Sequence, residues 1–195
     1  MGTTQIRSKV WRSLGAVALA ATLLNAHAGT LPAKRSAWSP DKWFVQAGAA
    51  EDTQMGVVGA TWQVPGLRDY EWGNVSGYFE LSLGRWVSSV DDGSSSSAWV
   101  TQVGLTPVLR WQPFKSSRWF TEAGIGVNLL APIYRSSDKR FSTAFNFGDH
   151  VGVGVQFGEP RTQELTLRLQ HFSNAGIKDP NPGANFVQLR YSARF

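Results

Sequence analysis

Cysteine is absent from the sequence of 195 residues, and histidine occurs only three times. The first absence excludes a disulfide framework, a cysteine nucleophile and thiolate metal ligands. The second leaves little for a histidine-based metal centre, because the two histidines beyond the first 28 residues, His150 and His171, fall on opposite faces of their predicted strands. We therefore expect neither a metal ion nor another cofactor.

Charged residues are scarce too, and much of the net charge of +5 belongs to the first residues of the chain. Three basic residues, an apolar run and a small-residue cleavage pattern follow one another there: Arg7, Lys9 and Arg12, then 14–24, then Ala26-His27-Ala28. This order is typical of a secretory signal peptide. We predict a cleaved signal over 1–28 and one domain over 29–195, with a lead-in over 29–42. Since the basic residues leave with the signal, charge gives no support to a nucleic-acid partner.

Long apolar runs are missing after the signal, so a transmembrane helix of about 18 or more residues is excluded. Gly-, Ser- and Pro-rich breaks instead divide the chain into eight stretches of strand length or longer: 43–51, 54–64, 75–87, 97–112, 118–130, 142–157, 162–173 and 184–195. Several of these alternate. In the fifth stretch an apolar set faces a polar or glycine set: Trp119, Ala123, Ile125, Val127 and Leu129 against Glu122, Gly124, Gly126 and Asn128. A period of two places each set on its own side of a sheet.

The polar faces indicate which side of the sheet is inside. A soluble barrel has an apolar interior, whereas a barrel that spans a membrane turns its apolar face to lipid and its polar face to the lumen. Gly, Gln, Glu, Asn and Arg lie opposite the long apolar faces here, which favours the second arrangement. We predict an all-β fold, an eight-stranded antiparallel transmembrane β-barrel of the outer-membrane type.

Aromatic residues at the strand ends support this fold. With both ends of the chain in the periplasm, the tryptophans form two belts: Trp43, Trp62, Trp111 and Trp119 at the inner ends of strands, Trp86 and Trp99 at the outer ends. The last strand ends on Phe195, with Tyr191 and Leu189 on the same face, which resembles the terminal signature of outer-membrane barrel proteins. An ordinary last strand of a lipocalin-like barrel or sandwich is the alternative. A pore is not expected, because side chains fill an eight-stranded lumen.

Polar residues interrupt the lipid-facing side of the seventh stretch near its outer end. His171 and Ser173 continue the face of three leucines, Leu165, Leu167 and Leu169. Polar groups that face hydrocarbon are costly, although less so near the interface.

The neighbouring stretch brings a carboxylate to this place. If Phe157 pairs with Gln163 across the turn at Pro160, the antiparallel register puts Asp149 directly opposite His171. Directly opposed residues have Cβ atoms about 4.5–5.5 Å apart. An acid, an imidazole and a hydroxyl in a row suit nucleophilic acyl transfer, because the imidazole takes the serine proton and the carboxylate stabilises its charged form. A set of interface residues solvated by headgroups is the structural alternative.

Two short motifs resemble the lipid A 3-O-deacylases, the PagL family. They are the run His171-Phe172-Ser173-Asn174-Ala175-Gly176 and, after it, Asn181-Pro182-Gly183. The segment 145–149 is similar to that family too, whereas the rest of the chain matches only in size and barrel pattern. The resemblance implies an eight-stranded outer-membrane barrel whose outward-facing serine and histidine hydrolyse the ester-linked acyl chain at position 3 of lipid A.

The resemblance also implies roles for single residues. His171 is the general base and Ser173 the nucleophile. Residues near the serine follow the family positions, with the Asn181 side chain and the Gly176 N–H as candidate oxyanion donors. The others are Asn174, close to the serine, and Phe147, an aromatic that could pack against an acyl chain.

One position departs from the family. The family takes its acid from the last strand, at the position that Asn185 occupies in this chain. Asn185 could orient His171, as the asparagine of Cys-His-Asn sites does, or Asp149 could supply the charge from the other side. The register favours Asp149, and Asp179 is a weaker third option.

Three functions follow. The first is an outer-membrane esterase with lipid A or lipopolysaccharide as substrate and its site facing the outer leaflet, among outer-membrane lipids, as a monomer or homodimer. The second is a phospholipase-type lipid hydrolase, although a calcium-dependent one would need carboxylates near Ser173 beyond Asp179. The third is a non-enzymatic structural or binding barrel, in which the outward polar residues are dispensable.

Overall fold

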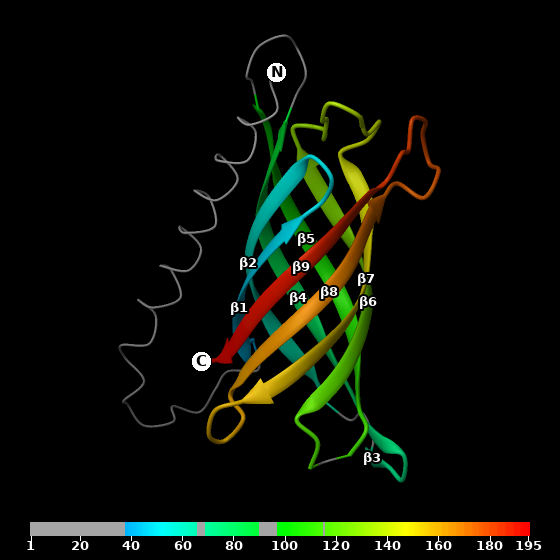
Figure 1. Ribbon diagram of the computed structural model, residues 1–195. Helices are drawn as coiled ribbons and strands as arrows, with labels where there is room; N and C mark the ends of the chain where they lie inside the picture. Colours follow the sequence, from blue (N-terminus) through cyan, green and yellow to red (C-terminus); the bar gives the residue numbers. More distant parts are fainter. Residues whose placement is uncertain (1–37, 66–68, 90–96, 115) are drawn as a thin grey trace, which may run out of the picture. The chain divides into compact units, whose positions relative to one another are not determined.

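A single antiparallel sheet closes on itself to form the barrel (Figure 1). The computed structural model describes residues 38–65, 69–89, 97–114 and 116–195. Its long strands are β1 (Lys42–Ala49), β2 (Thr53–Val64), β4 (Gly73–Ser89), β5 (Ser97–Gln112), β6 (Trp119–Ala131), β7 (Phe145–Phe157), β8 (Gln163–Ser173) and β9 (Ala184–Arg194). A two-residue strand, β3 (Asp69–Tyr70), pairs with the start of β4.

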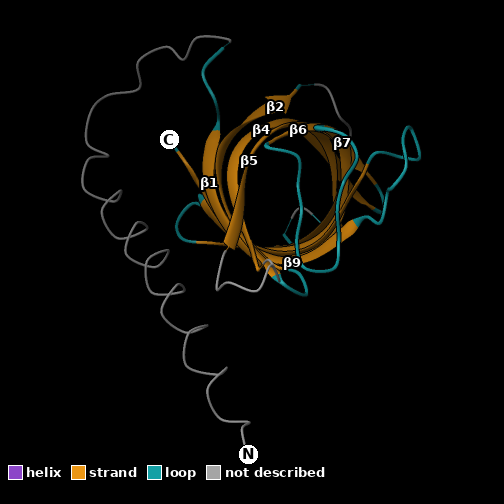
Figure 2. Cartoon of the chain, turned by 90° about the horizontal axis from the view of Figure 1, so that it is seen from above, coloured by secondary structure: helices purple, strands orange, loops and turns teal. Residues whose placement is uncertain are grey.

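The long strands form a closed ring in which sequence neighbours pair with each other. β2 pairs with β4, and β1 pairs with β9, so that no long strand keeps an unpaired edge. Figure 2 shows this ring from above. The connections β1–β2, β6–β7 and β8–β9 lie at one end, here called the distal end, and the C-terminus lies at the other.

The eight predicted strands are confirmed, with ends that differ by a few residues. The predicted signal peptide and residues 29–37 of the lead-in lie outside the described residues. The described part of the chain contains no helix of the length and apolarity that a membrane span needs.

Apolar side chains cover the outside of the barrel. Ile125 and Leu129 on β6 are 68% and 59% exposed, whereas Glu122 and Asn128 on the same strand are buried in the lumen. The predicted inversion of a soluble barrel is therefore confirmed. It requires the lumen to satisfy most of its own polar groups, because these side chains are buried.

Buried ion pairs meet this requirement near the middle of the lumen. The Arg168 guanidinium donates to Glu122 Oε1 from Nε at 2.8 Å and to Glu80 Oε2 from Nη1 at 3.1 Å. Arg110 joins Glu122 Oε2 at 2.8 Å and Glu164 Oε1 at 2.7 Å. Removing one partner of such a set leaves an uncompensated buried charge, so these residues hold strands from opposite sides of the ring together.

An aromatic cluster fills another part of the lumen and corrects one prediction. Trp86 is completely buried and its indole N–H donates to Gln102 Oε1 at 2.8 Å. It therefore does not belong to an outer aromatic belt, although Trp99 does face outward. Trp86 shares its inward parity on β4 with polar residues, and its ring packs against Phe172 and Phe186 at 4.7 and 4.8 Å between centroids.

Candidate active site

The end of β8 carries two polar side chains on the outside of the barrel. Phe172 is completely buried against Trp86 in the lumen, so strand alternation turns its neighbours His171 and Ser173 outward. Both are half-buried rather than exposed. The aromatic cluster thereby anchors the segment that presents the imidazole and the hydroxyl.

The predicted register between β7 and β8 is confirmed. Phe157 pairs with Gln163, and the same ladder places Asp149 opposite His171 and Phe147 opposite Ser173. Asp149 is exposed on the outer wall. The site therefore has a carboxylate on the β7 side of the imidazole.

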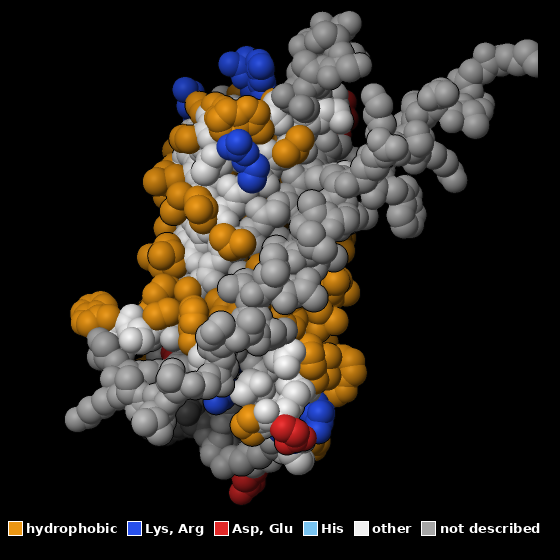
Figure 3. Space-filling model, turned by 90° about the vertical axis from the view of Figure 1, so that its left-hand side faces the viewer, with side chains coloured by type: hydrophobic (Ala, Val, Ile, Leu, Met, Phe, Trp, Pro, Cys, Tyr) orange, Lys and Arg blue, Asp and Glu red, His pale blue; other side chains and the backbone are white. Residues whose placement is uncertain are grey.

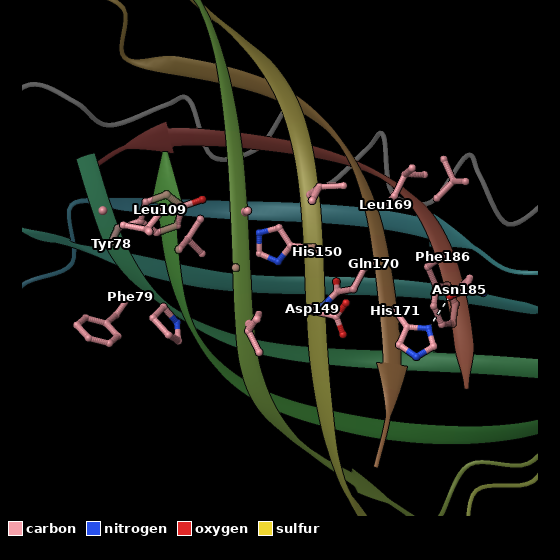
Figure 4. Close-up of a pocket in the computed structure, with 18 of the residues that line it drawn as sticks. Tyr78, Phe79, Leu109, Asp149, His150, Leu169, Gln170, His171, Asn185 and Phe186 are labelled. Carbon is pink, nitrogen blue, oxygen red and sulfur yellow. Dashed lines mark hydrogen bonds between the residues drawn. The ribbon is translucent and has the colours of Figure 1, made fainter. Parts of the chain in front are cut away.

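The direct partner of the imidazole comes from the other side, on β9. Asn185 is also in register with His171, and its Oδ1 lies 2.6 Å from His171 Nδ1 (Figure 4). Since an amide oxygen only accepts, Nδ1 is the protonated nitrogen and Nε2 keeps its lone pair. Within the described residues neither Asp149 nor Asp179 hydrogen-bonds the ring; Asp179 is exposed in the β8–β9 connection. The geometry gives Asn185 the orienting bond and places Asp149 opposite the imidazole in the strand register.

A glycine lies directly against the imidazole. Gly183 has a φ of +66°, and a Cβ added to it would lie 2.6 Å from His171 Cε1. Real Cβ atoms do not approach so closely, so a side chain at this position would push the ring away. Gly183 belongs to the Asn181-Pro182-Gly183 motif, but its contact with the imidazole leaves no signal in spacing or periodicity.

The turn after Ser173 is built around the buried side chain of Asn174. Its Nδ2 donates to Lys178 O at 2.7 Å and to Ser142 Oγ at 3.0 Å, which ties the β8–β9 connection to the β6–β7 connection. Its backbone N–H donates to Asn181 Oδ1 at 3.0 Å. Asn174 is thus a structural residue of the site, and Ser142 is an anchor that no sequence pattern predicted.

The candidate oxyanion donors differ in the hydrogen bonds that they already make in the structure. Because Asn181 Oδ1 accepts the bond from Asn174, its Nδ2 group remains as the donor. The N–H of Gly176 donates to Asn174 Oδ1 at 2.9 Å. The N–H of Ala175 lies 3.4 Å from Ser173 Oγ, which makes it a further backbone donor beside the nucleophile.

An apolar groove leads away from these residues along the outer wall (Figure 4). Its volume is about 980 Å³, and Asp149, His171 and Asn185 line one end. The remaining outward-facing side chains that line it are apolar: Val64, Phe79, Pro107, Leu109, Ala123, Ile125, Val151, Leu169 and Val187. Side chains that point into the lumen, Tyr78, His150 and Phe186 among them, also border it. Phe147 lies beside the same end, half-buried and edge-on to Phe145 at 5.1 Å between centroids.

Acid and imidazole groups do not gather into a metal site in the described residues, where no group of three or more such ligands is found.

Comparisons with known proteins identify the family of the chain. The family model for lipid A 3-O-deacylase (PagL) matches residues 56–194. The lipid A deacylase PagL of Bordetella bronchiseptica is 41% identical over 124 residues, or 64% of this chain, and that of Pseudomonas aeruginosa is 31% identical over 120 residues, or 61%. The chain spans 65% of the length of each of these relatives.

A solved structure shares the fold. The crystal structure of the outer membrane enzyme PagL superposes with a TM-score of 0.68 at 24% identity, and the match covers 79% of this chain and 99% of that one. At this identity the likeness concerns the fold alone.

Proposed function

The chain belongs to the lipid A 3-O-deacylase (PagL) family, and on that premise we propose that it is an outer-membrane esterase that removes the 3-hydroxyacyl chain from position 3 of lipid A. One observation carries the proposal. On an apolar outer wall, His171, Asp149 and Asn185 occupy one row of the sheet, with Ser173 two residues along β8. A merely structural barrel has no need of these groups where lipid lies.

The reaction follows from the groups present. Ser173 Oγ attacks the ester carbonyl carbon while His171 Nε2 takes the hydroxyl proton, which gives a tetrahedral oxyanion. Asn181 Nδ2 donates to that oxyanion, with the Gly176 and Ala175 N–H groups as further donors once the turn adjusts. As the intermediate collapses, the sugar hydroxyl leaves with the proton from His171. Water then hydrolyses the acyl-serine by the same two proton transfers, and a 3-hydroxy fatty acid is released.

Two side chains assist the imidazole in different ways, one by orienting it and the other by its charge. Asn185 accepts from Nδ1–H and so keeps Nε2 free to act as the base. Asp149 stabilises the imidazolium from β7 by its charge. A carboxylate in the family's position does both, whereas here we assign orientation and charge to separate residues.

The groove supports an acyl chain as substrate. Its outward-facing lining is apolar over several strands, and the proposed base His171 lies at one end, with Ser173 two residues further along β8. An acyl chain along the groove would bring its ester carbonyl to the distal end of β8. We therefore place the distal end at the outer leaflet, where lipid A is found, with the C-terminal end in the periplasm. One chain holds every proposed residue, so a monomer is sufficient.

Hydrolysis by the purified barrel tests this function. Wild-type protein in detergent micelles should release 3-hydroxy fatty acid from lipid A, and Ser173→Ala should abolish release, since loss of a nucleophile typically costs several powers of ten in rate. Heat-dependent gel mobility checks that the variant is folded. Phosphatidylethanolamine in the same micelles distinguishes the phospholipase alternative: equal hydrolysis of this lipid would contradict a lipid A deacylase. No hydrolysis of either lipid would leave the non-enzymatic barrel.

A further inference from the structure

One arginine lies on the apolar outer wall, away from the proposed active site. Arg85 faces outward on β4 between Leu83 and Val87, which are 52% and 46% exposed. Its guanidinium carbon lies 3.9 Å over the ring of Trp99, and Nη1 donates to Thr101 Oγ1 at 3.3 Å. No carboxylate of the described residues pairs with it. A charge on a lipid-facing surface is costly unless an anion or water solvates it. The depth of the guanidinium in the membrane therefore decides whether it contacts acyl chains or headgroups.

Strand geometry gives that depth. The row of partners through His171 passes across β7, β6 and β5 to Phe79 on β4. With strands tilted by about 40° and about 4.8 Å apart, four steps along this row descend about 12 Å from the distal end. The stretch of β4 from Phe79 to Arg85 then climbs about 15 Å. Arg85 therefore lies at about the depth of His171, the level at which the proposed orientation places headgroups.

The arginine lies on the opposite side of the barrel from the proposed nucleophile. β4 is four strands away from β8 in both directions around the ring. A headgroup bound at Ser173 therefore lies on the other side of the barrel from Arg85.

The side of the guanidinium next to β2 is open. Gly56 is the register partner of Arg85 there, and nothing lies within 4 Å of the point where a Cβ would be. In Figure 3, Lys and Arg side chains lie near the upper, distal end of the visible wall and others near its lower end, and hydrophobic side chains lie between them.

We propose that Arg85, with Trp99 and Thr101, binds a phosphate group of a second lipid A molecule that is not a substrate. A guanidinium makes paired, charge-assisted hydrogen bonds to a phosphate, and the open side at Gly56 admits one. The indole holds the guanidinium from one face and offers apolar surface to the lipid at the interface. This inference rests on the location and orientation of the proposed function, but not on its catalytic step.

Native mass spectrometry of the detergent-solubilised barrel tests the proposal by counting bound lipids. The Ser173→Ala variant serves as the parent, so that no lipid is consumed, and the probe is lipid A with both phosphates. We expect the parent to bind two molecules. Arg85→Gln should weaken the binding of one of them about tenfold, the worth of one charge-assisted contact, and Arg85→Lys should keep part of the affinity.

The matched control is Arg118→Gln. Arg118 is also exposed and adjoins an exposed tryptophan, Trp119, but lies at the C-terminal end of the barrel, so its loss should change neither binding event. Unchanged binding of two molecules by Arg85→Gln, or equal binding of lipid A without phosphates, would overturn the proposal. If phosphatidylglycerol bound at Arg85 as tightly as lipid A, the site would not be selective for lipid A, and the proposed ligand would be wrong. If the proposed function were wrong but the Arg85 site right, the wild-type barrel would bind lipid A without hydrolysing it.

Discussion

Asp149→Asn removes one negative charge beside His171 and keeps the size of the side chain. The two residues are register partners, so their Cβ atoms are about 4.5–5.5 Å apart, and we take about 5 Å as the distance between the two charges. At an effective dielectric between about 20 and 80, for an exposed residue at an interface, the attraction to an imidazolium is about 1–3 kcal/mol. Because the imidazolium forms only as Ser173 loses its proton, we expect kcat to fall about 5- to 150-fold with KM little changed.

Asn185 gives the matched comparison from the other flank. Asn185→Ala removes one neutral orienting hydrogen bond, worth about 0.5–1.5 kcal/mol, so kcat should fall about 2- to 12-fold. Asn185→Asp places a carboxylate where the amide oxygen now lies, 2.6 Å from His171 Nδ1. In the Asp149→Asn background this second change should therefore restore most of the lost rate.

The assay for both residues is the release of 3-hydroxy fatty acid from lipid A at saturating concentration. Gel mobility before and after heating confirms that each variant is folded. Full kcat in Asp149→Asn would refute the use of its charge and leave a serine–histidine pair oriented by Asn185 alone. Failure of Asn185→Asp to rescue Asp149→Asn would show that Asp149 acts by something other than charge.

Three further predictions concern the ring position and the barrel. Gly183→Ala should lower kcat about a hundredfold, because its Cβ would displace the His171 ring. The control is Gly158→Ala, which has a similar φ of +74° in a remote turn and should leave kcat unchanged. Equal losses of kcat in both variants would assign the effect to backbone strain. Arg168→Ala should destabilise the barrel by about 3–5 kcal/mol, because Glu80 and Glu122 each lose one buried, charge-assisted hydrogen bond worth about 1.5–3 kcal/mol and keep only their other arginine partner. Urea titration of gel mobility measures this, and an unchanged midpoint would contradict it. Circular dichroism in detergent should show almost pure β signal, and substantial helix would contradict the fold.

The sequence allowed most of the fold to be predicted, because a period of two specifies both strand and face. The prediction for Trp86 is wrong for an instructive reason: tryptophan gathers at membrane interfaces, but parity on β4 places Trp86 inside with Glu80 and Ser82. Parity decides the face more strongly than residue type, since a one-residue slip would turn the whole strand over.

The sequence allowed only those contacts of the candidate site to be predicted that follow from strand register. The pairing of Asp149 with His171 follows from one short turn, and the structure confirms it. The hydrogen bond to Asn185, the contact of Gly183 and the anchoring of Asn174 depend on side-chain rotamers and on the path of the β8–β9 connection. Neither periodicity nor spacing contains that information.

Mass spectrometry of lipid A from the outer membranes of cells that express the wild-type chain or Ser173→Ala tests the central claim most directly. The wild-type chain should shift lipid A by the mass of one ester-linked 3-hydroxyacyl chain, with the amide-linked chains untouched, and Ser173→Ala should leave lipid A intact although the barrel is present in the membrane. Lipid A that is the same in both, or a shifted lipid A in the Ser173→Ala cells, would contradict it.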